Sequence, residues 1–477
     1  MGFNIGANDY SILKQSYIKK YIKLYLLNFQ LNIVDEISGD LIGLEVSIDA
    51  NSDLRRSCTV NLVVQNSSFD IQPGGKIWLD KYIQPYIGYE NIHTKEIQWY
   101  NQGTYLINAP SFSYDGASRT LQLQGLDMMS KLTGLRNGNL PSIPTVITTG
   151  SNVRQAIIAT LKLANMNKYI VSECVNTDGA IQNVPYDITI NQGGTIYNIL
   201  SELRDILPQY QMYFDVDGVF HYEQIPFGYD APVILDDDIL SRITTSESVD
   251  TDFESVKNYI EVYGRSHDVQ HYSSTATVSG GNIRLAYGSI TETTIKANTM
   301  IGFTLTTDIN SPVAIGINNI SGFHKLVDES GVQIKMLKAN EYYVAVYQSN
   351  NTWLFLGHNQ AQAIASDTNP DSPFYINGDI GIIRIALYGG EYDNIMSDNL
   401  AKQRADIELY WRCRLNDAMS LGCIPIPWLD VNYIISYTLS NQSASDKYMI
   451  QSIKADYGES NSMTITTSKY YPYYKEG

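Results

Sequence analysis

The sequence predicts a mainly β protein with some α-helix, in the α+β class, and three observations predict it. Apolar and polar residues alternate over long segments, as they do in strands that bury one face. Asp-Gly dipeptides, which favour tight turns, separate pairs of such segments. Tyrosine is abundant, with 36 residues against 12 Phe and 5 Trp. Because Tyr combines a β preference with a polar tip, this excess favours half-buried strands and extensive interfaces.

Strand patterns recur from the first hundred residues to the last. Alternation runs from Leu41 to Val64, and Thr104–Asp127 predicts two strands around Asp115-Gly116. Met212–Ile225 repeats the pattern, with Asp217-Gly218 placed for a two-residue type I′ turn. Three further strands are expected near the C-terminus, in NYIISYTL, KYMIQSIKADY and SMTITTSKYY.

Three helices interrupt this β pattern. Ser151 is the expected N-cap of the first, and Thr195 is the expected N-cap of the second, which Pro208 stops. The third is expected from Asp398 to Leu421, followed by Gly422 at the C′ position and then by Pro425. Apolar stripes at helical spacing, typical of core packing, support the three helices: Val153, Ile157 and Leu161; Ile196, Leu200, Leu203 and Leu207; Ile407, Trp411, Leu415 and Met419.

Charge and length exclude some classes of protein. The 477 residues are 44% hydrophobic and 17% charged, enough for a large core and for several domains. Lys and Arg total 33 against 50 Asp and Glu, a net charge of −17. A protein that grips nucleic acid needs a surplus of cations, so this balance disfavours that function but allows a surface along which nucleic acid slides.

The N-terminus carries no signal peptide pattern, because lysines interrupt its apolar residues at Lys14, Lys19, Lys20 and Lys23. No stretch approaches the ~18 uncharged apolar residues of a membrane-spanning helix. The four cysteines are scattered and form neither a disulfide framework nor a zinc motif. We therefore expect a soluble protein made in a cytoplasm.

Candidate catalytic and metal sites are weak. The Asp215-x-Asp217-Gly218 run lacks the later ligands of a calcium loop and favours a hairpin turn. Asp236–Asp238 favours a solvated loop over paired catalytic acids. His267 and His271 have the spacing of a metal pair on a helix, but their segment is not helical. Neither Cys58 nor Cys413 lies in a nucleophile motif, so we expect no enzyme, metal or cofactor.

A specific resemblance comes from a series of segments in a fixed order. They are SDLRRSCTVNLVV (Ser52–Val64), IWLDKYIQPYIGY (Ile77–Tyr89), the run from Trp99 to Gly134, YFDVDGVFHYEQIP (Tyr213–Pro226), FESVKNYIEVYGR (Phe253–Arg265), the long helix, IPWLDVNYIISYT (Ile426–Thr438) and a terminal strand pair. This series resembles the tail hub proteins of bacteriophages: the baseplate hubs of contractile tails, the N-terminal part of tail-associated lysins, and VgrG-type hubs. The resemblance covers most of the chain except Ser266–Ala365.

The resemblance implies two tube-like β-barrel domains, a mixed α/β domain and an inserted small β module. The first barrel would span Leu41–Leu126, and the second would combine Val256–Arg265 with Gly378–Tyr473. The domain boundaries that follow are 1–40 for an N-terminal helix and lead-in strand, 41–130 for the first tube-like domain, 131–235 for the mixed domain with its hairpin, 236–265 plus 366–477 for the second tube-like domain with the long helix, and 266–365 for the inserted β-rich module.

The resemblance also implies a function. The hub would be a homotrimer in the virion tail, assembled in the cytoplasm of a bacterial host. It would join a hexameric tail tube or distal tail protein to other baseplate or tip proteins. Its channel would pass tape-measure protein and then DNA, without specific binding, during host cell entry. An acidic chain suits such a wall because it repels phosphate. Unlike tail-associated lysins, the sequence reaches Gly477 directly after its terminal strands, so we expect no C-terminal peptidase.

Two alternatives remain open. The inserted module looks similar to small β modules that decorate tail proteins, which favours a receptor- or glycan-binding adsorption protein. Its candidate contacts with a glycan or partner are aromatic: Tyr342, Tyr343, Tyr347 and Trp353. Alternating tyrosines in a strand are also typical of packing. The other alternative is a cell-wall-degrading tail enzyme, which the absence of nucleophile and metal motifs disfavours.

Overall fold

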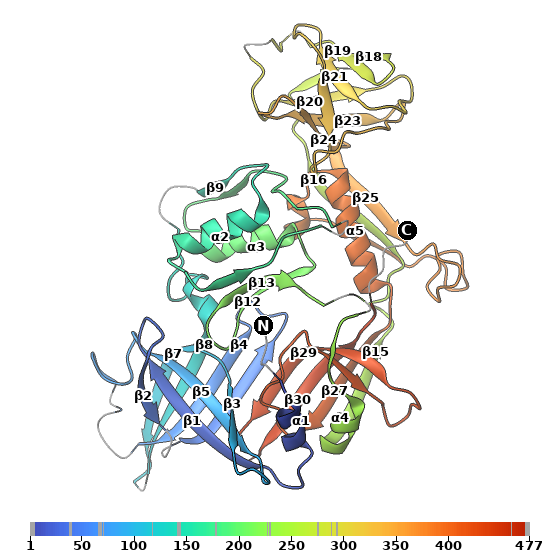
Figure 1. The fold of residues 1–477 in the computed structure, drawn as a ribbon. Coiled ribbons are helices and arrows are strands. Elements are labelled where there is room, and N and C mark those ends of the chain that lie inside the picture. The colour runs from blue at the N-terminus through green and yellow to red at the C-terminus, as the bar shows by residue number, and fades with distance from the viewer. Residues whose placement is uncertain are drawn as a thin grey trace.

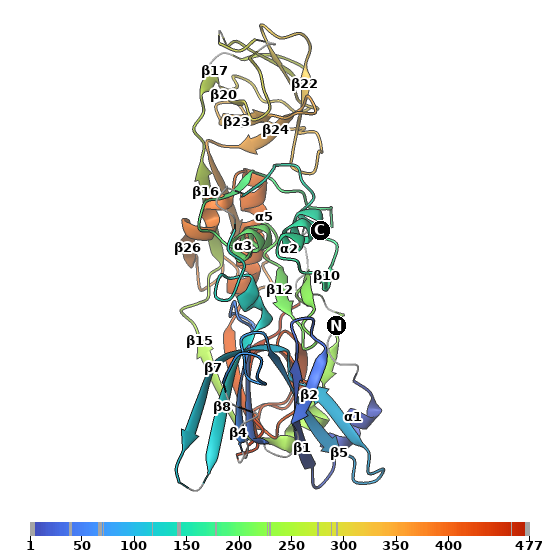
Figure 2. The same cartoon turned by 90° about the vertical axis from the view of Figure 1, so that its left-hand side faces the viewer.

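The computed structural model describes residues 5–472 apart from 38–40, 65–68, 70, 117, 141–144, 177–178, 227, 229, 274–275, 288, 292–293 and 459. The chain is mainly β with few helices, as the sequence predicts. It is elongated, with a broad β base, a middle tier that holds three of the helices, and a small β unit at the far end (Figures 1 and 2).

The base is one sheet of fourteen strands within the described residues, curved into a nearly closed, barrel-like surface. Its longest path runs β15-β27-β30-β29-β3-β4-β8-β7-β5-β1-β2. The N-terminal half contains helix α1 (Ala7–Leu13) and strands β1 (Lys19–Leu27), β2 (Ile33–Ile37), β3 (Leu41–Asp49), β4 (Arg56–Val63), β5 (Tyr82–Glu90), β6 (Ile97–Asn101), β7 (Tyr105–Tyr114) and β8 (Arg119–Asp127). Since β1 and β2 extend the same sheet, the segment expected as a lead-in contributes two full strands.

The C-terminal half of this sheet is built from two distant parts of the chain. It contains β14 (Val233–Leu235), helix α4 (Asp237–Ile243), β15 (Thr244–Asp252), β27 (Asn416–Cys423), β28 (Ile434–Tyr437), β29 (Asp446–Asp456) and β30 (Ser462–Lys469). The three strands predicted near the C-terminus are therefore confirmed as β28, β29 and β30. β29 pairs with β3 over residues 452–456 and 45–49, and this ladder makes the two halves one sheet.

The middle tier contains two small α/β packings. Helices α2 (Val153–Leu163) and α3 (Ile196–Asp205) lie side by side above the sheet β10-β13-β12. Helix α5 (Asp398–Arg412) packs on β16 and β25. The strands of this tier are β9 (Thr145–Ile147), β10 (Tyr169–Val171), β11 (Ile188–Ile190), β12 (Tyr210–Phe214), β13 (Phe220–Gln224), β16 (Tyr259–Ser266), β25 (Gln360–Ser366) and β26 (Arg384–Leu387), with short 3-10 helices at Met128–Lys131 and Gly390–Asn394.

The far unit is an eight-stranded sheet with its own apolar core. Its short strands are β17 (His271–Ser273), β18 (Ala276–Ser279), β19 (Asn282–Leu285), β20 (Met300–Thr304), β21 (Ala314–Ile317), β22 (His324–Val327), β23 (Tyr342–Tyr347) and β24 (Trp353–Gly357). The chain enters through β16 and leaves through β25, which pair antiparallel as a neck. β16 also pairs with β26 rather than with the base sheet. The expectation that Val256–Arg265 supplies a strand to the second barrel is therefore wrong.

The longest helix ends earlier than its apolar stripe predicts. α5 stops at Arg412, and residues 416–423 form β27 between β15 and β30. Met419 and Leu421 are fully buried on one face of that strand. The helix prediction ran too far because the four-residue spacing that leads to Met419 also fits the two-residue period of a strand. Gly422 therefore lies on β27 and is not a helix C′ residue. A Cβ at Gly422 would lie 2.4 Å from the Ser246 hydroxyl on the neighbouring strand, so this close strand contact favours glycine.

Of three local predictions, two need smaller corrections. Asn152 rather than Ser151 caps α2, since its side chain accepts from the Gln155 amide. Thr195 does cap α3, with a capping box. The hairpin at Asp217-Gly218 is present, but five residues separate its strands and only Gly218 of the two has a positive φ, 73°. It is therefore not a two-residue type I′ turn, because that turn needs positive φ at both central positions.

The acidic run also has a different setting from the expected loop. Asp236 precedes α4, and Asp237 and Asp238 lie in its first turn, where carboxylates interact favourably with the positive end of the helix dipole.

Among the described residues, no helix combines the length and the apolar character that crossing a bilayer would need.

A glycine on β8 tests the packing of the base. A Cβ at Gly125 would lie 2.5 Å from Cys58 Sγ and 2.7 Å from Tyr105 Cβ, both of them buried. We expect Gly125→Ala to lower the free energy of unfolding by about 1–3 kcal/mol, the usual range for overpacking. Gly228→Ala is the matched control, since nothing lies within 4 Å of its Cβ. Thermal unfolding measures both, and equal melting temperatures for the two variants would contradict the packing.

Candidate functional site

The four aromatic residues predicted as surface contacts divide into two pairs. Tyr343 and Trp353 are 6% and 1% exposed and belong to the core of the far unit. Tyr342 and Tyr347 are half-buried and reach the surface. Tyr342 stacks on Tyr272, with ring centroids 5.3 Å apart. A glycan contact stays a prediction, and the surface residues that suit it are Tyr342, Tyr347 and Tyr272.

The other candidate residues have structural surroundings. The Asp237 carboxylate accepts from the Thr438 amide and hydroxyl, and Asp238 pairs with Lys14 and Arg242. His267 is buried, whereas the His271 ring contacts Ser289. Throughout the described part of the chain, no group of three His, Cys, Asp or Glu side chains is placed to hold a metal ion.

A buried polar network lies instead at the seam between the halves of the base. Arg56, on β4, forms an ion pair with Asp430, which precedes β28. Their side chains are 4% and 12% exposed. Asp127, at the end of β8, accepts from the backbone amides of Arg56 and Met129. Because buried charges are costly unless paired, this arrangement holds the two halves in one register.

Tyrosine hydroxyls add further hydrogen bonds across the seam. Tyr89 donates to the carbonyl of Pro425 at 2.7 Å, and Tyr457 donates to the Gln102 side chain at 3.0 Å. Gln102 in turn donates to the carbonyl of Pro427 at 2.8 Å. Burial raises the pKa of Tyr89 and Tyr457, so both stay neutral donors. The abundance of Tyr therefore serves an internal interface here.

The β12–β13 hairpin joins this seam from the middle tier. Its loop accepts hydrogen bonds from Asn101 and Thr104, at Val216 and Asp217. Within the hairpin, His221 is fully buried, with Nε2 2.9 Å from Asp215 and Nδ1 3.5 Å from Glu223. Burial opposes the protonation of His221, but the contacts with the two carboxylates outweigh it and raise its pKa. Of the residues first considered for calcium, Asp215 thus contacts a buried histidine, and Asp217 instead accepts from Asn101.

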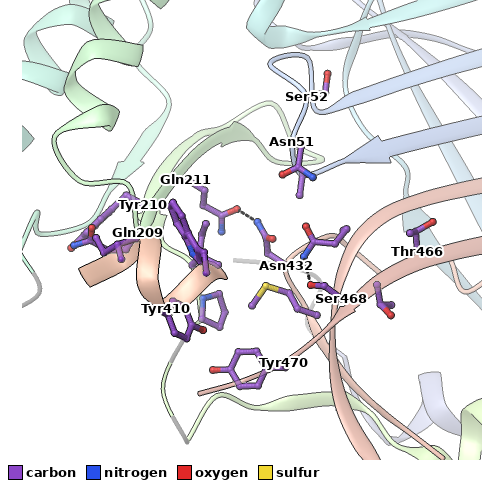
Figure 3. Close-up of a pocket in the computed structure, with 18 of the residues that line it drawn as sticks. Asn51, Ser52, Gln209, Tyr210, Gln211, Tyr410, Asn432, Thr466, Ser468 and Tyr470 are labelled. Carbon is purple, nitrogen blue, oxygen red and sulfur yellow. Dashed lines mark hydrogen bonds between the residues drawn. The ribbon is translucent and has the colours of Figure 1, made fainter. Parts of the chain in front are cut away.

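A cleft of about 780 Å³ opens where four parts of the chain converge on the seam. Its wall is formed by the β3–β4 turn, α3 with β12, the end of α5, and strands β29 and β30 (Figure 3). In Figure 3, Gln211 and Asn432 meet across the cleft, 2.6 Å apart, with Tyr410 and Tyr470 on its other side. Arg55 also lines the cleft and donates to Gln211 at 2.5 Å.

From the sequence we did not predict a role for Arg55, Arg56 or Asp430. One signal was available: Arg56 shares the inward face of its strand with Cys58, Val60 and Leu62 by strict alternation. A charged residue on an apolar face indicates a buried partner. No local pattern identifies that partner, because Asp430 lies 374 positions further along the chain.

Comparisons with known proteins agree with this fold. The chain is similar to the tail protein from Neisseria meningitidis MC58, with a TM-score of 0.51, 9% identity, and coverage of 94% of this chain and 96% of that one. It is also similar to the prophage MuSo2 43 kDa tail protein from Shewanella oneidensis, with a TM-score of 0.48, 11% identity, and coverage of 94% and 98%. Residues 371–474 match a domain of unknown function, DUF5048. No curated protein sequence matches the chain.

The chain thus has the fold of a tail protein, and the resemblance to phage tail proteins that the sequence predicts is confirmed at this level. The shared fold covers nearly the whole chain, including both halves of the base sheet.

The buried ion pair at the seam generates a stability prediction. Asp430→Asn leaves the Arg56 charge buried without its partner, and we expect a loss of about 3–5 kcal/mol in the free energy of unfolding. Replacing both residues, by Arg56→Met with Asp430→Leu, should recover most of the loss. Asp238→Asn breaks an exposed, solvent-screened pair and should lower the stability far less. Chemical denaturation measures all three, and equal losses for Asp430→Asn and Asp238→Asn would refute the role of the seam.

Proposed function

We propose that the chain is a structural protein at the tip of a phage tail or of a tail-like particle. Three copies form a ring that joins the tail tube to the baseplate or tip, and the ring encloses the channel for tape-measure protein and DNA. The fold shared with the Neisseria tail protein supports a place in a tail. This role places the protein in the virion tail, after assembly in the cytoplasm of a bacterial host.

The continuous base sheet carries this proposal. Its path ends at β2 on one side and at β15 on the other, and within the described residues each of these strands has one unpaired edge. Unpaired edges favour the addition of further strands. β2 exposes Ile33 and Val34, at 57% and 51%, and β15 exposes Val249 at 37%. Two different edges that meet head to tail form a closed ring if the rotation between copies allows it.

Symmetry then explains a match to a hexameric tube. Each copy brings two sheet halves, so three copies present six, in a pseudo-six-fold arrangement. The net charge of −17 suits the channel of such a ring, because an acidic wall repels the phosphates of passing DNA.

A structural role also agrees with the state of the cysteines. Burial raises the pKa of Cys174, Cys413 and Cys423 to about 12 each. A cysteine nucleophile needs the opposite shift, because the thiolate is the reactive form. We therefore propose that the chain is not an enzyme and that any cell-wall cleavage belongs to another protein.

The stacked Tyr272 and Tyr342 favour a second role in adsorption. Tyr272 is 52% exposed on β17, a strand of the far unit, away from the base sheet (Figure 2). Exposed aromatic rings with polar tips suit glycan contact. We expect the full chain to bind glycans on an array and Tyr272→Ala to lose this signal, whereas Tyr388→Ala, a substitution at a 73% exposed tyrosine outside the far unit, keeps it. No binding by the unsubstituted protein, or equal loss for both variants, would exclude this role.

The proposed ring predicts the mass of the assembly in solution and predicts that this mass depends on the open edge of β2. Light scattering should give about 160 kDa, three times the 53.5 kDa chain. Val34→Lys places a charge on the open edge of β2 and should reduce the mass to one chain, because charges block edge pairing. Val146→Lys is the matched control, since Val146 is 50% exposed on β9, outside the base sheet. A six-chain mass, or a trimer that Val34→Lys leaves intact, would contradict this arrangement.

A further inference from the structure

The cleft at the seam has a charge opposite to that of the whole chain. Five basic residues line it against two acidic ones, whereas the chain carries a net charge of −17. The basic residues are Arg55, Arg204, Arg412, Arg414 and Lys469, and the acidic residues are Asp53 and Glu408. Cations gathered in a hollow of an acidic protein focus an attractive potential on anionic groups.

Two of these cations have no carboxylate partner among the described residues. Arg55 is 5% exposed, and its guanidinium donates to Gln211 and lies 4.0 Å from the Tyr213 ring. Asp430 attracts Arg55 electrostatically but is itself paired with Arg56. Arg414 lies over the rings of Tyr410 and Tyr471, 5.0 and 5.9 Å from their centroids. A buried guanidinium charge that no carboxylate pairs is costly, so Arg55 favours an anionic group in the cleft.

The remaining wall suits an extended peptide better than a compact anion. Side-chain amides and hydroxyls line the cleft, among them Asn51, Gln209, Asn432 and Ser468. Such groups pair with peptide N–H and C=O groups. Tyr410 and Tyr470 provide flat apolar surfaces beside them. At about 780 Å³ the cleft is large for one phosphate and lies within the range of pockets that hold ligands of several groups.

We infer that this cleft docks an acidic, extended segment of a partner protein, with a carboxylate of the segment paired to Arg55 and a second one held by Arg414. Arg is suited to this task because its planar guanidinium binds carboxylate with two parallel hydrogen bonds. The inference goes beyond the proposed function and does not depend on it, since every lining residue belongs to one copy of the chain.

Fluorescence anisotropy of the full chain with a labelled hexaglutamate peptide tests the inference. We expect binding that weakens with added salt, because exposed charges are screened, and no binding of a hexaglutamine peptide. Arg55→Gln should weaken hexaglutamate binding roughly tenfold or more, as expected when one partner of a buried charge pair is removed. Arg414→Gln removes a half-buried side chain, and we expect it also to weaken hexaglutamate binding, without a risk to the fold.

The control variant and two competing outcomes keep the test decisive. Arg119→Gln removes an exposed cation on β8, outside the cleft, and should leave the affinity unchanged. Equal binding of hexaglutamine, or equal affinities in Arg414→Gln and Arg119→Gln, would overturn the inference. So would displacement of the peptide by an equal concentration of inorganic phosphate, because the cleft would then be a site for small anions. Loss of the ring mass in Val34→Lys, with hexaglutamate binding kept, separates this inference from the proposed function.

Discussion

The antiparallel ladder between β3 and β29 is the contact on which the rest of the structure depends. It joins strands some 400 positions apart in the sequence and turns two barrel-like halves into one curved sheet. A single apolar core extends across both halves, and the Arg56–Asp430 pair fixes them beside it. The halves therefore cannot rotate independently without exposing core residues and separating buried charges.

The seam also explains where the other features lie. The β12–β13 hairpin docks on it through Asn101 and Thr104 and thereby positions the helices of the middle tier. The cleft is the space left where this hairpin, α5 and the seam strands meet. The far unit is attached elsewhere, through the β16–β25 neck and the contact of His358 with Asp398 at the start of α5. One rigid base thus carries a separately attached outer unit.

Local patterns in the sequence predicted the elements better than their assembly. The hairpin around Asp115-Gly116 and the cap at Thr195 follow from side-chain chemistry within a few residues. The helix expected through Leu421 failed because Met419 fits two periods, and burial between β15 and β30 selects the strand. The seam and the cleft depend on contacts such as Arg55–Gln211 and Arg56–Asp430, in which no short window of sequence identifies the partner. The division into domains stays a proposal, since one core spans both halves of the base.

Cryo-electron microscopy of the purified protein tests the central claim most directly. The account predicts a three-fold ring in which β2 of each copy lies beside β15 of the next, so that the base sheet continues around a central channel. A ring with other strands at the join, a two-fold assembly, or a base sheet whose β2 and β15 edges both remain free in the assembly would contradict it.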